Sequence, residues 1–127
     1  MYISEYKNIK KKIDDSLLRE AFRRTIDKEE FVFVCKKICQ RHKLSFRNGQ
    51  FNISSLKKRC EGGVIVNKKK KLIPYVFIRP DELNFGTLLH EFTHVILFMK
   101  GYLNANHNEL FIETYTKLLT NFSNGLY

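Results

Sequence analysis

The chain has 127 residues, with 23 Lys and Arg against 13 Asp and Glu, so its formal net charge is +10. This length fits one domain, and a 43% share of hydrophobic residues excludes a disordered polycation. The longest apolar stretches, such as residues 95–99, fall far short of the ~20 residues that span a bilayer, so we expect no membrane insertion. Three cysteines cannot all pair within one chain, which favours reduced thiols and an intracellular setting, either cytoplasmic or nuclear.

The N-terminal part of the chain, residues 1–43, is predicted to be helical. Apolar residues recur at helical spacing over residues 13–22, which indicates a first amphipathic helix. Asp27 is the expected N-cap of a second helix, because Glu30 stands in capping-box register and Ile26 and Phe31 are placed as a hydrophobic staple. We expect this second helix to end near residues 40–43.

Residues 44–79 are predicted to form a small β-sheet, because the apolar pattern changes to alternation there. Residues 44–46 and 51–53 flank the turn dipeptide Asn48-Gly49, which predicts a hairpin. Further runs of β-forming residues occupy 64–66 and 72–78. We expect these strands to assemble as an antiparallel sheet.

Residues 84–122 are predicted to contain two helices. A nearly all-apolar helix runs from about Asn84 to Lys100, and Gly101 is a plausible C-cap. After the polar residues 102–106, a last amphipathic helix passes through Phe111 and Phe122. The expected fold class is therefore α+β, with N-terminal helices, a small antiparallel β-sheet, an active-site helix and a C-terminal helix. We expect a single domain over residues 1–127.

The first of these two helices contains His90-Glu91-Phe92-Thr93-His94, an H-E-x-x-H motif. Residues i and i+4 lie one above the other on a helix face, so both imidazoles can reach one metal ion while Glu91 reaches a metal-bound water. We therefore predict a zinc metallopeptidase. His90 and His94 are the expected metal ligands, Glu91 is the expected catalytic general base, and one catalytic Zn2+ is the expected cofactor.

A catalytic zinc ion usually takes three protein ligands, and the motif supplies two. His107 is the preferred third ligand, because a loop reversal after the motif helix could return it to the metal. Glu113 is the competing candidate, since a glutamate one helix later is the other common solution, and Glu109 is a weaker choice. The sequence does not identify the residue that stabilises the oxyanion, for which Tyr102 and Tyr115 qualify by residue type only.

A second cluster of possible metal ligands falls on the second predicted helix. Cys35, Cys39 and His42 share one face of that helix, and Cys60 lies elsewhere in the chain. Three or four such groups could hold a structural zinc ion. Cys35 and Cys39 coincide with the apolar stripe, however, where free cysteine behaves as a small hydrophobe. Core packing is therefore the preferred interpretation.

The positive charge is concentrated in the first two thirds of the chain. Residues 1–80 carry 21 basic and 8 acidic side chains, whereas residues 81–127 carry 2 basic and 5 acidic ones. A basic surface attracts nucleic acid because neutralising phosphates releases counterions. We predict DNA as a partner besides the protein substrate. The alternative is a solvated surface that only maintains solubility. The candidate nucleic-acid contacts are Lys57, Lys58, Arg59, Lys68, Lys69, Lys70 and Lys71.

The residues around the motif resemble the core of SprT-like zinc metallopeptidases, the group that includes Spartan. The run G-T-L-L-H-E-F-T-H at residues 86–94, followed by H-N-E-L-F at residues 107–111, is similar to the L-L-H-E-x-x-H motif, short loop and H-x-x-x-F context of that family. The likeness covers roughly residues 40–122. It implies a minimal zincin-like fold, His90, His94 and His107 as zinc ligands, Glu91 as the base, and proteolysis of DNA-bound proteins.

Two other function classes remain open from the sequence. Peptidases that cleave phage-type repressors also carry H-E-x-x-H, with a downstream glutamate as third ligand, and Glu113 would take that role here. A non-catalytic DNA-binding module with a structural zinc ion is the third interpretation. The identity of the third ligand and the occurrence of turnover distinguish these classes.

Overall fold

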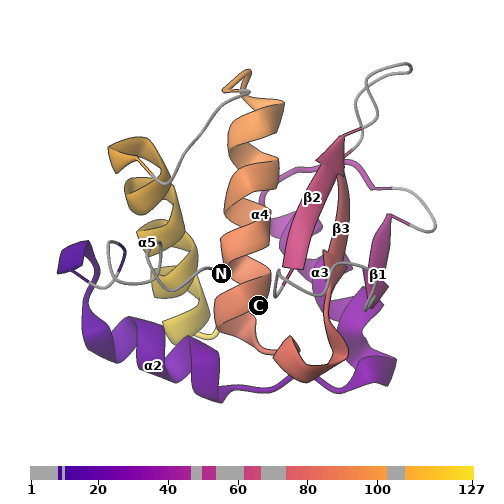
Figure 1. Ribbon diagram of the computed structural model, residues 1–127, viewed down its shortest axis with the longest axis horizontal. Helices are drawn as coiled ribbons and strands as arrows, with labels where there is room; N and C mark the ends of the chain where they lie inside the picture. The colour runs from indigo at the N-terminus through magenta and orange to yellow at the C-terminus, as the bar shows by residue number, and fades with distance from the viewer. Residues whose placement is uncertain (1–8, 10, 47–49, 54–61, 67–73, 103–107) are drawn as a thin grey trace.

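The computed structural model describes residues 9, 11–46, 50–53, 62–66, 74–102 and 108–127. Helices and a small sheet make up the described chain, which confirms the α+β class (Figure 1). In chain order the elements are α2 (Asp15–Arg23), a 3-10 turn (Lys28–Glu30), α3 (Phe31–Arg41), β1 (Phe51–Ile53), β2 (Gly62–Val66), β3 (Pro74–Ile78), a second 3-10 turn (Pro80–Glu82), α4 (Phe85–Met99) and α5 (Glu109–Ser123).

The sheet is mixed, so the prediction of an antiparallel sheet is wrong. Its strand order is β1-β3-β2, with β3 in the centre. β2 pairs antiparallel with β3, whereas β1 pairs parallel with it, Phe51 standing opposite Val76. Parallel neighbours need a long connection between them. The stretch of chain between Ile53 and Pro74, which includes β2, provides that connection.

The first strand of the predicted hairpin does not form: residues 44–46 have no regular secondary structure, and Leu44 is bonded to the end of α3. Lys43 has a left-handed φ of 56°, and its N–H donates to the Gln40 carbonyl. The Leu44 N–H donates to the Cys39 carbonyl at 2.8 Å. These two bonds define a Schellman motif, which reverses the chain and holds Leu44 at the helix end. The dipeptide at residues 48–49 lies outside the described residues.

The beginning of α3 also differs from the prediction. Asp27 precedes the 3-10 turn Lys28–Glu30, but its side chain makes no capping hydrogen bond, and α3 itself begins at Phe31. The expected capping box is therefore not formed. Ile26 and Phe31 are both buried, as the staple prediction required.

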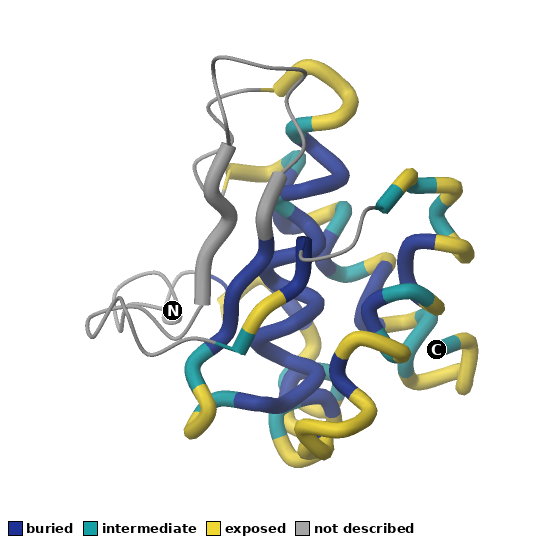
Figure 2. Tube along the Cα trace, turned by 90° about the vertical axis from the view of Figure 1, so that its right-hand side faces the viewer, coloured by how far each residue is buried: buried dark blue, intermediate teal, exposed yellow. Residues whose placement is uncertain are grey.

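Helix α4 lies between the other elements of the fold. It packs against α2 and α5 on one side and against β2 and β3 on the other (Figure 1). The buried trace runs along most of α4, whereas α2 and α5 alternate between buried and exposed residues (Figure 2). A helix that is apolar on nearly all sides requires this central place.

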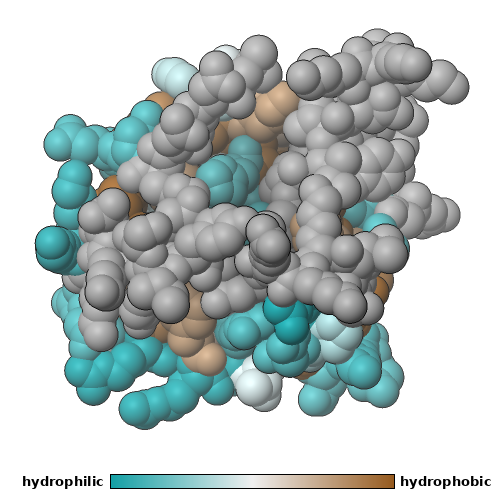
Figure 3. Space-filling model, in the orientation of Figure 1, coloured by the Kyte–Doolittle hydropathy of each residue, from teal (hydrophilic) through white to brown (hydrophobic). Residues whose placement is uncertain are grey.

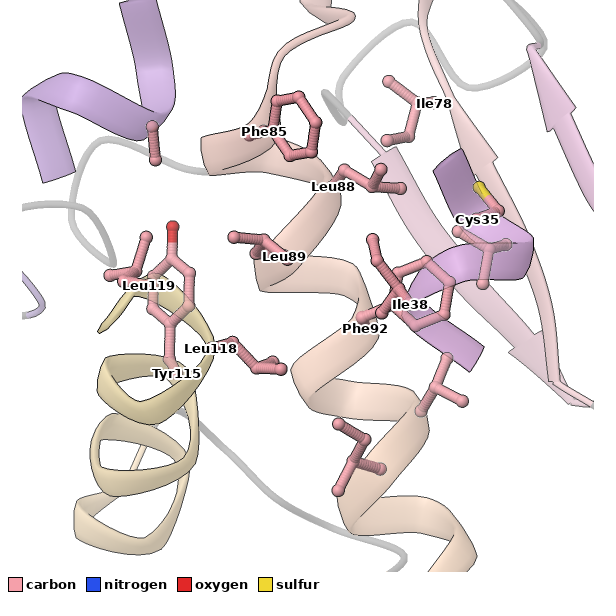
Figure 4. Close-up of a cluster of buried hydrophobic side chains, with 14 of the residues drawn as sticks. Cys35, Ile38, Ile78, Phe85, Leu88, Leu89, Phe92, Tyr115, Leu118 and Leu119 are labelled. Carbon is pink, nitrogen blue, oxygen red and sulfur yellow. The ribbon is translucent and has the colours of Figure 1, made fainter. Parts of the chain in front are cut away.

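The hydrophobic core continues across α4. Figure 4 shows Leu89 directed towards Tyr115 and its neighbours on α5. On the other side lie Phe92, next to Ile38 of α3, and Ile78 of β3. All five side chains are fully buried members of one hydrophobic cluster. This packing fixes the rotation of α4 about its axis, and with it the direction of the motif side chains.

Both ends of α4 are closed by local hydrogen bonds, and the cap at Gly101 confirms the prediction for the C-terminal end. Asn84 is the N-cap, and its side chain accepts the Thr87 N–H at 2.8 Å. At the other end Gly101 has φ 93°, and the N–H groups of Gly101 and Tyr102 donate to the carbonyls of Phe98 and Leu97. Gly101 is thus the C-cap glycine of a second Schellman motif.

The surface around α2 is polar. In Figure 3, which has the orientation of Figure 1, hydrophilic side chains cover the lower left of the molecule, where α2 lies. A shallow groove there is lined by Asp15, Ser16, Arg19, Glu20, Arg23 and Arg24. Within the described ranges, no helix has the length and apolar character needed to cross a bilayer.

Candidate metal centre

The predicted motif lies on α4, in the part of the helix that is packed on both sides. His90 and Glu91 are 3% and 4% exposed, whereas His94, one turn later, is half-buried. His90 and His94 occupy one face of the helix, because positions i and i+4 are stacked, and Glu91 follows about 100° around the axis from His90. This placement is consistent with the prediction that His90 and His94 lie on the same face of a helix.

The two imidazole rings lie against each other and against an aromatic residue of α5. The centroids of His90 and His94 are 5.1 Å apart with the rings edge to face. The Phe111 ring lies 5.0 Å from His90 and 4.8 Å from His94. The Tyr115 ring approaches His90 edge-on at 5.7 Å. Packing by α5 therefore restricts both imidazoles to the same region of space.

The Glu91 carboxylate lies on the Nε2 side of His90. The distance between His90 Nε2 and a Glu91 carboxylate oxygen is 3.9 Å. This separation is too long for a direct hydrogen bond but suits a water molecule that contacts both groups. The structure thus places a histidine ring nitrogen and a buried carboxylate close enough to contact the same small ligand.

Helices α4 and α2 approach each other closely at Gly86. A Cβ atom added to Gly86 would come within 3.0 Å of three ring atoms of Phe22 on α2. The Tyr115 hydroxyl donates a 2.7 Å hydrogen bond to the Gly86 carbonyl, and Tyr115 is fully buried. Tyr115 therefore positions α5 on α4, one turn before His90. Tyr102, the other tyrosine considered for the oxyanion, is 52% exposed beyond the end of α4.

The donor set on α4 fits a zinc ion. Two imidazoles four residues apart are a common pair of zinc ligands, and the adjacent buried carboxylate matches the H-E-x-x-H arrangement. Within the described ranges no group of three or more His, Cys, Asp or Glu side chains is placed to hold a metal ion. His107, the predicted third ligand, lies outside these ranges, two residues before α5 begins at Glu109.

The glutamates proposed as alternative ligands are exposed on α5. Glu113 follows Phe111 by two residues, which is a rotation of about 200° around a helix. Because Phe111 contacts both imidazoles, Glu113 starts on the opposite side of α5. Glu109 precedes Phe111 by the same interval. Both glutamates are exposed, in agreement with this geometry.

The Cys35, Cys39 and His42 cluster is not assembled as a metal site in the described chain. Cys35 and Cys39 are buried in the core, which confirms the preferred interpretation. Burial raises the pKa of both thiols, that of Cys39 to about 12, as expected for cysteines packed in an apolar core. His42 Nε2 instead lies 2.5 Å from the Tyr127 hydroxyl. Cys60 lies outside the described residues.

The lysines and the arginine proposed as nucleic-acid contacts fall on residues 57–59 and 68–71, all outside the described residues. In the described chain, the arginines lining the α2 groove are balanced in part by acidic groups. Asp15 forms an ion pair with Arg19, and Glu20 accepts a hydrogen bond from Ser123. This groove therefore adds no strong anion site to the predicted one.

Sequence reasoning gave no separate role to two residues near the motif, Gly86 and Thr87. Gly86 is an isolated glycine in an apolar helix, a pattern that often marks a close approach. Thr87 precedes His90 by three residues and so shares its helix face, which the sequence alone would have allowed us to notice.

No family model, curated protein or solved structure matches this chain.

Proposed function

We propose that this protein is a zinc-dependent endopeptidase that acts on DNA-associated proteins. The observation that carries the proposal is the convergence of three motif groups on α4. His90 Nε2 lies 3.9 Å from the buried Glu91 carboxylate, and the His90 and His94 rings are 5.1 Å apart. Two histidines at positions i and i+4, with a buried glutamate directly after the first, match the ligands and the base of an H-E-x-x-H zinc site.

The residues of this chain have separate roles in the proposed reaction. His90, His94 and His107 would hold the ion, which supplies a more acidic water and a polarised substrate carbonyl when bound. Glu91 accepts a proton from the attacking water and transfers it to the leaving amine. Phe111 and Tyr115 exclude water from one side of His90 and hold its ring in place.

DNA association follows from the charge of the chain. The excess of 13 positive charges in residues 1–80, from 21 basic and 8 acidic side chains, favours a polyanionic partner. The metal motif lies in the other part of the chain, residues 81–127, which contains 2 basic and 5 acidic side chains. A division of labour between a basic binding surface and a peptidase site accounts for this asymmetry.

The proposal is tested by measuring zinc content and proteolysis on the same variants. Glu91→Gln keeps the metal ligands but removes the proton acceptor, so we expect full zinc content and at least about a 100-fold lower cleavage rate. His107→Ala is expected to lose zinc and cleavage together. Zinc is measured by elemental mass spectrometry, and cleavage on a histone substrate with and without DNA.

Glu113→Gln is the matched control, because it makes the same chemical change at an exposed glutamate of α5. It is expected to keep both zinc and cleavage. Loss of zinc in this variant, with zinc retained in His107→Ala, would favour the repressor-cleaving class. Cleavage by Glu91→Gln at the wild-type rate would contradict the mechanism, and zinc without any proteolysis would indicate a structural metal site.

A further inference from the structure

Thr87 is a buried threonine on the motif face of α4 whose hydroxyl behaves differently from those of the other helical threonines. Four threonines in the described helices donate their hydroxyl to the carbonyl four residues earlier, at distances from 2.7 to 2.9 Å: Thr93, Thr114, Thr116 and Thr120. Thr87 is 1% exposed, and its Oγ1 makes no hydrogen bond in the described chain.

The position of Thr87 at the start of α4 explains why this local bond is missing. The carbonyl four residues earlier belongs to Leu83, which precedes the N-cap Asn84. That carbonyl already accepts the Ile26 N–H at 2.9 Å, beside the β-bridge between Thr25 and Asn84. Leaving a buried hydroxyl without a partner destabilises the folded chain. Valine has the same shape and would avoid this cost.

The short side chain of Thr87 limits which polar atoms its hydroxyl can contact. Thr87, His90 and His94 occupy one face of α4, at i, i+3 and i+7. Threonine Oγ1 is one bond from Cβ and histidine Nδ1 is two bonds from Cβ, so both lie close to the helix backbone, whereas the carboxylate oxygens of a glutamate are three bonds from Cβ. Thr87 Oγ1 and His90 Nδ1 are both shielded from solvent. Metal-binding histidines almost always donate their second ring N–H to a fixed acceptor.

We propose that Thr87 is a positioning residue for the metal centre: its hydroxyl accepts a hydrogen bond from His90 Nδ1–H and so fixes the tautomer whose Nε2 binds the metal. Metal binding, which holds the imidazole in place, completes this bond. The inference rests on the proposed zinc site. It assigns no contact between Thr87 and substrate.

Zinc affinity tests this role without requiring turnover. Competition with a chromophoric chelator gives the zinc Kd of the wild type, Thr87→Val and Thr87→Ser. Removing an outer-shell partner of a metal ligand typically lowers affinity by about 10–100-fold, and we expect a loss in this range for Thr87→Val. Thr87→Ser keeps the hydroxyl and is expected to bind zinc within a few-fold of the wild type.

Thr93→Val is the matched control, because Thr93 is a fully buried threonine on the same helix whose hydroxyl already bonds to Leu89. It should leave the zinc Kd unchanged. The metal-free melting temperature of Thr87→Val should be no lower than that of the wild type, since the change removes a hydroxyl without a partner. This result would separate metal positioning from folding.

The outcomes distinguish this inference from the proposed function. Equal zinc affinity in the wild type and Thr87→Val would overturn the role of Thr87 and leave the peptidase proposal intact. Equal losses in Thr87→Val and Thr87→Ser would also overturn it, because the hydroxyl would not be responsible. A wild type that binds no zinc would overturn both proposals, whereas zinc binding without proteolysis would overturn only the proposed function.

Discussion

His90 and His94 differ in their exposure, and this difference indicates from which side the proposed metal site is accessible. Phe111 contacts both rings, and Tyr115 also contacts His90, which is 3% exposed, whereas His94 is half-buried. Access to the proposed metal is therefore from the His94 side. The spacing of the motif predicted the shared face but not this asymmetry, because the covering rings come from α5, about twenty residues further along the chain.

The close approach at Gly86 makes a prediction about stability. Gly86→Ala places a methyl group against the Phe22 ring, and overpacking of this kind costs about 1–3 kcal/mol. We expect urea unfolding, followed by circular dichroism, to show a free energy of unfolding lower by this amount. Helix propensity alone would predict the opposite sign, because alanine stabilises a helix interior relative to glycine.

The double variant Gly86→Ala/Phe22→Ala provides the control for this effect. Removing the Phe22 ring opens the space that the new methyl group needs. The two changes should therefore be non-additive, with the alanine at position 86 costing less in the double variant. A Gly86→Ala variant as stable as the wild type would show that α2 moves away from α4 without cost.

At the scale of the elements, the end of α3 shows why local patterns mislead at boundaries. Residues 44–46 alternate like a strand, but Leu44 is held by the bond from its N–H to the Cys39 carbonyl. The left-handed residue that makes this possible is Lys43, whereas glycine is the usual signal for such an end. The end of α4 was predictable because Gly101 gives that signal.

A pair of exchanges tests this account of the helix ends. Lys43→Gly relieves the left-handed strain of a side chain, so we expect the free energy of unfolding to rise by about 0.5–1 kcal/mol. Gly101→Ala imposes that strain, and since nothing lies within 4 Å of the added Cβ atom, the expected loss of about 1 kcal/mol reflects the backbone alone. Chemical denaturation measures both.

Lys43 is exposed, so its side chain offers no competing explanation. The control is Lys43→Ala, which shortens the side chain but keeps the strain and should leave the stability near that of the wild type. A destabilised Lys43→Gly variant would contradict the assigned helix end.

At the scale of the whole molecule, a contact between His42 and Tyr127 joins the end of α3 to the segment after α5. His42 Nε2 lies 2.5 Å from the Tyr127 hydroxyl, which also accepts a hydrogen bond from Asn121 on α5. Burial, and then the nearby charges of Lys117, Arg41 and Lys100, lower the pKa of His42 below 6.5. Burial raises the pKa of Tyr127 to about 12.

These shifts predict a stability maximum between about pH 7 and pH 9. The unfolded chain binds a proton at His42 more readily than the folded chain, so stability is lost as pH falls below 6.5. At high pH the unfolded chain loses protons first, from Cys39 above its ordinary pKa of 9.0 and from Tyr127 above 10.0, so stability falls there too. Urea unfolding at pH 5.5, 8 and 10.5 measures the profile.

His42→Gln is the control for the acid side, because glutamine does not titrate. Its stability should depend less on pH between 5.5 and 8 than that of the wild type, while the alkaline loss remains. An unchanged acid slope would exclude His42 as its source.

The parallel pairing of β1 was the part of the fold that the sequence could not predict. The dipeptide Asn48-Gly49 favours a local hairpin, but Phe51 packs on Phe92 with ring centroids 5.7 Å apart, and β1 pairs with β3 instead. β1 therefore packs on α4, about forty residues further along the chain, and pairs with β3 rather than with the residues before the turn. Patterns within one segment carry no information about such partners.

The central place of β3 also bears on the order of assembly during synthesis. β1 and β2 each pair only with β3 in the described sheet, and β3 is the last of the three strands to leave the ribosome. Neither earlier strand has a partner until Ile78 has emerged, and α4 follows almost at once. The sheet and the helix that carries the motif are therefore expected to form together, in one late step of folding.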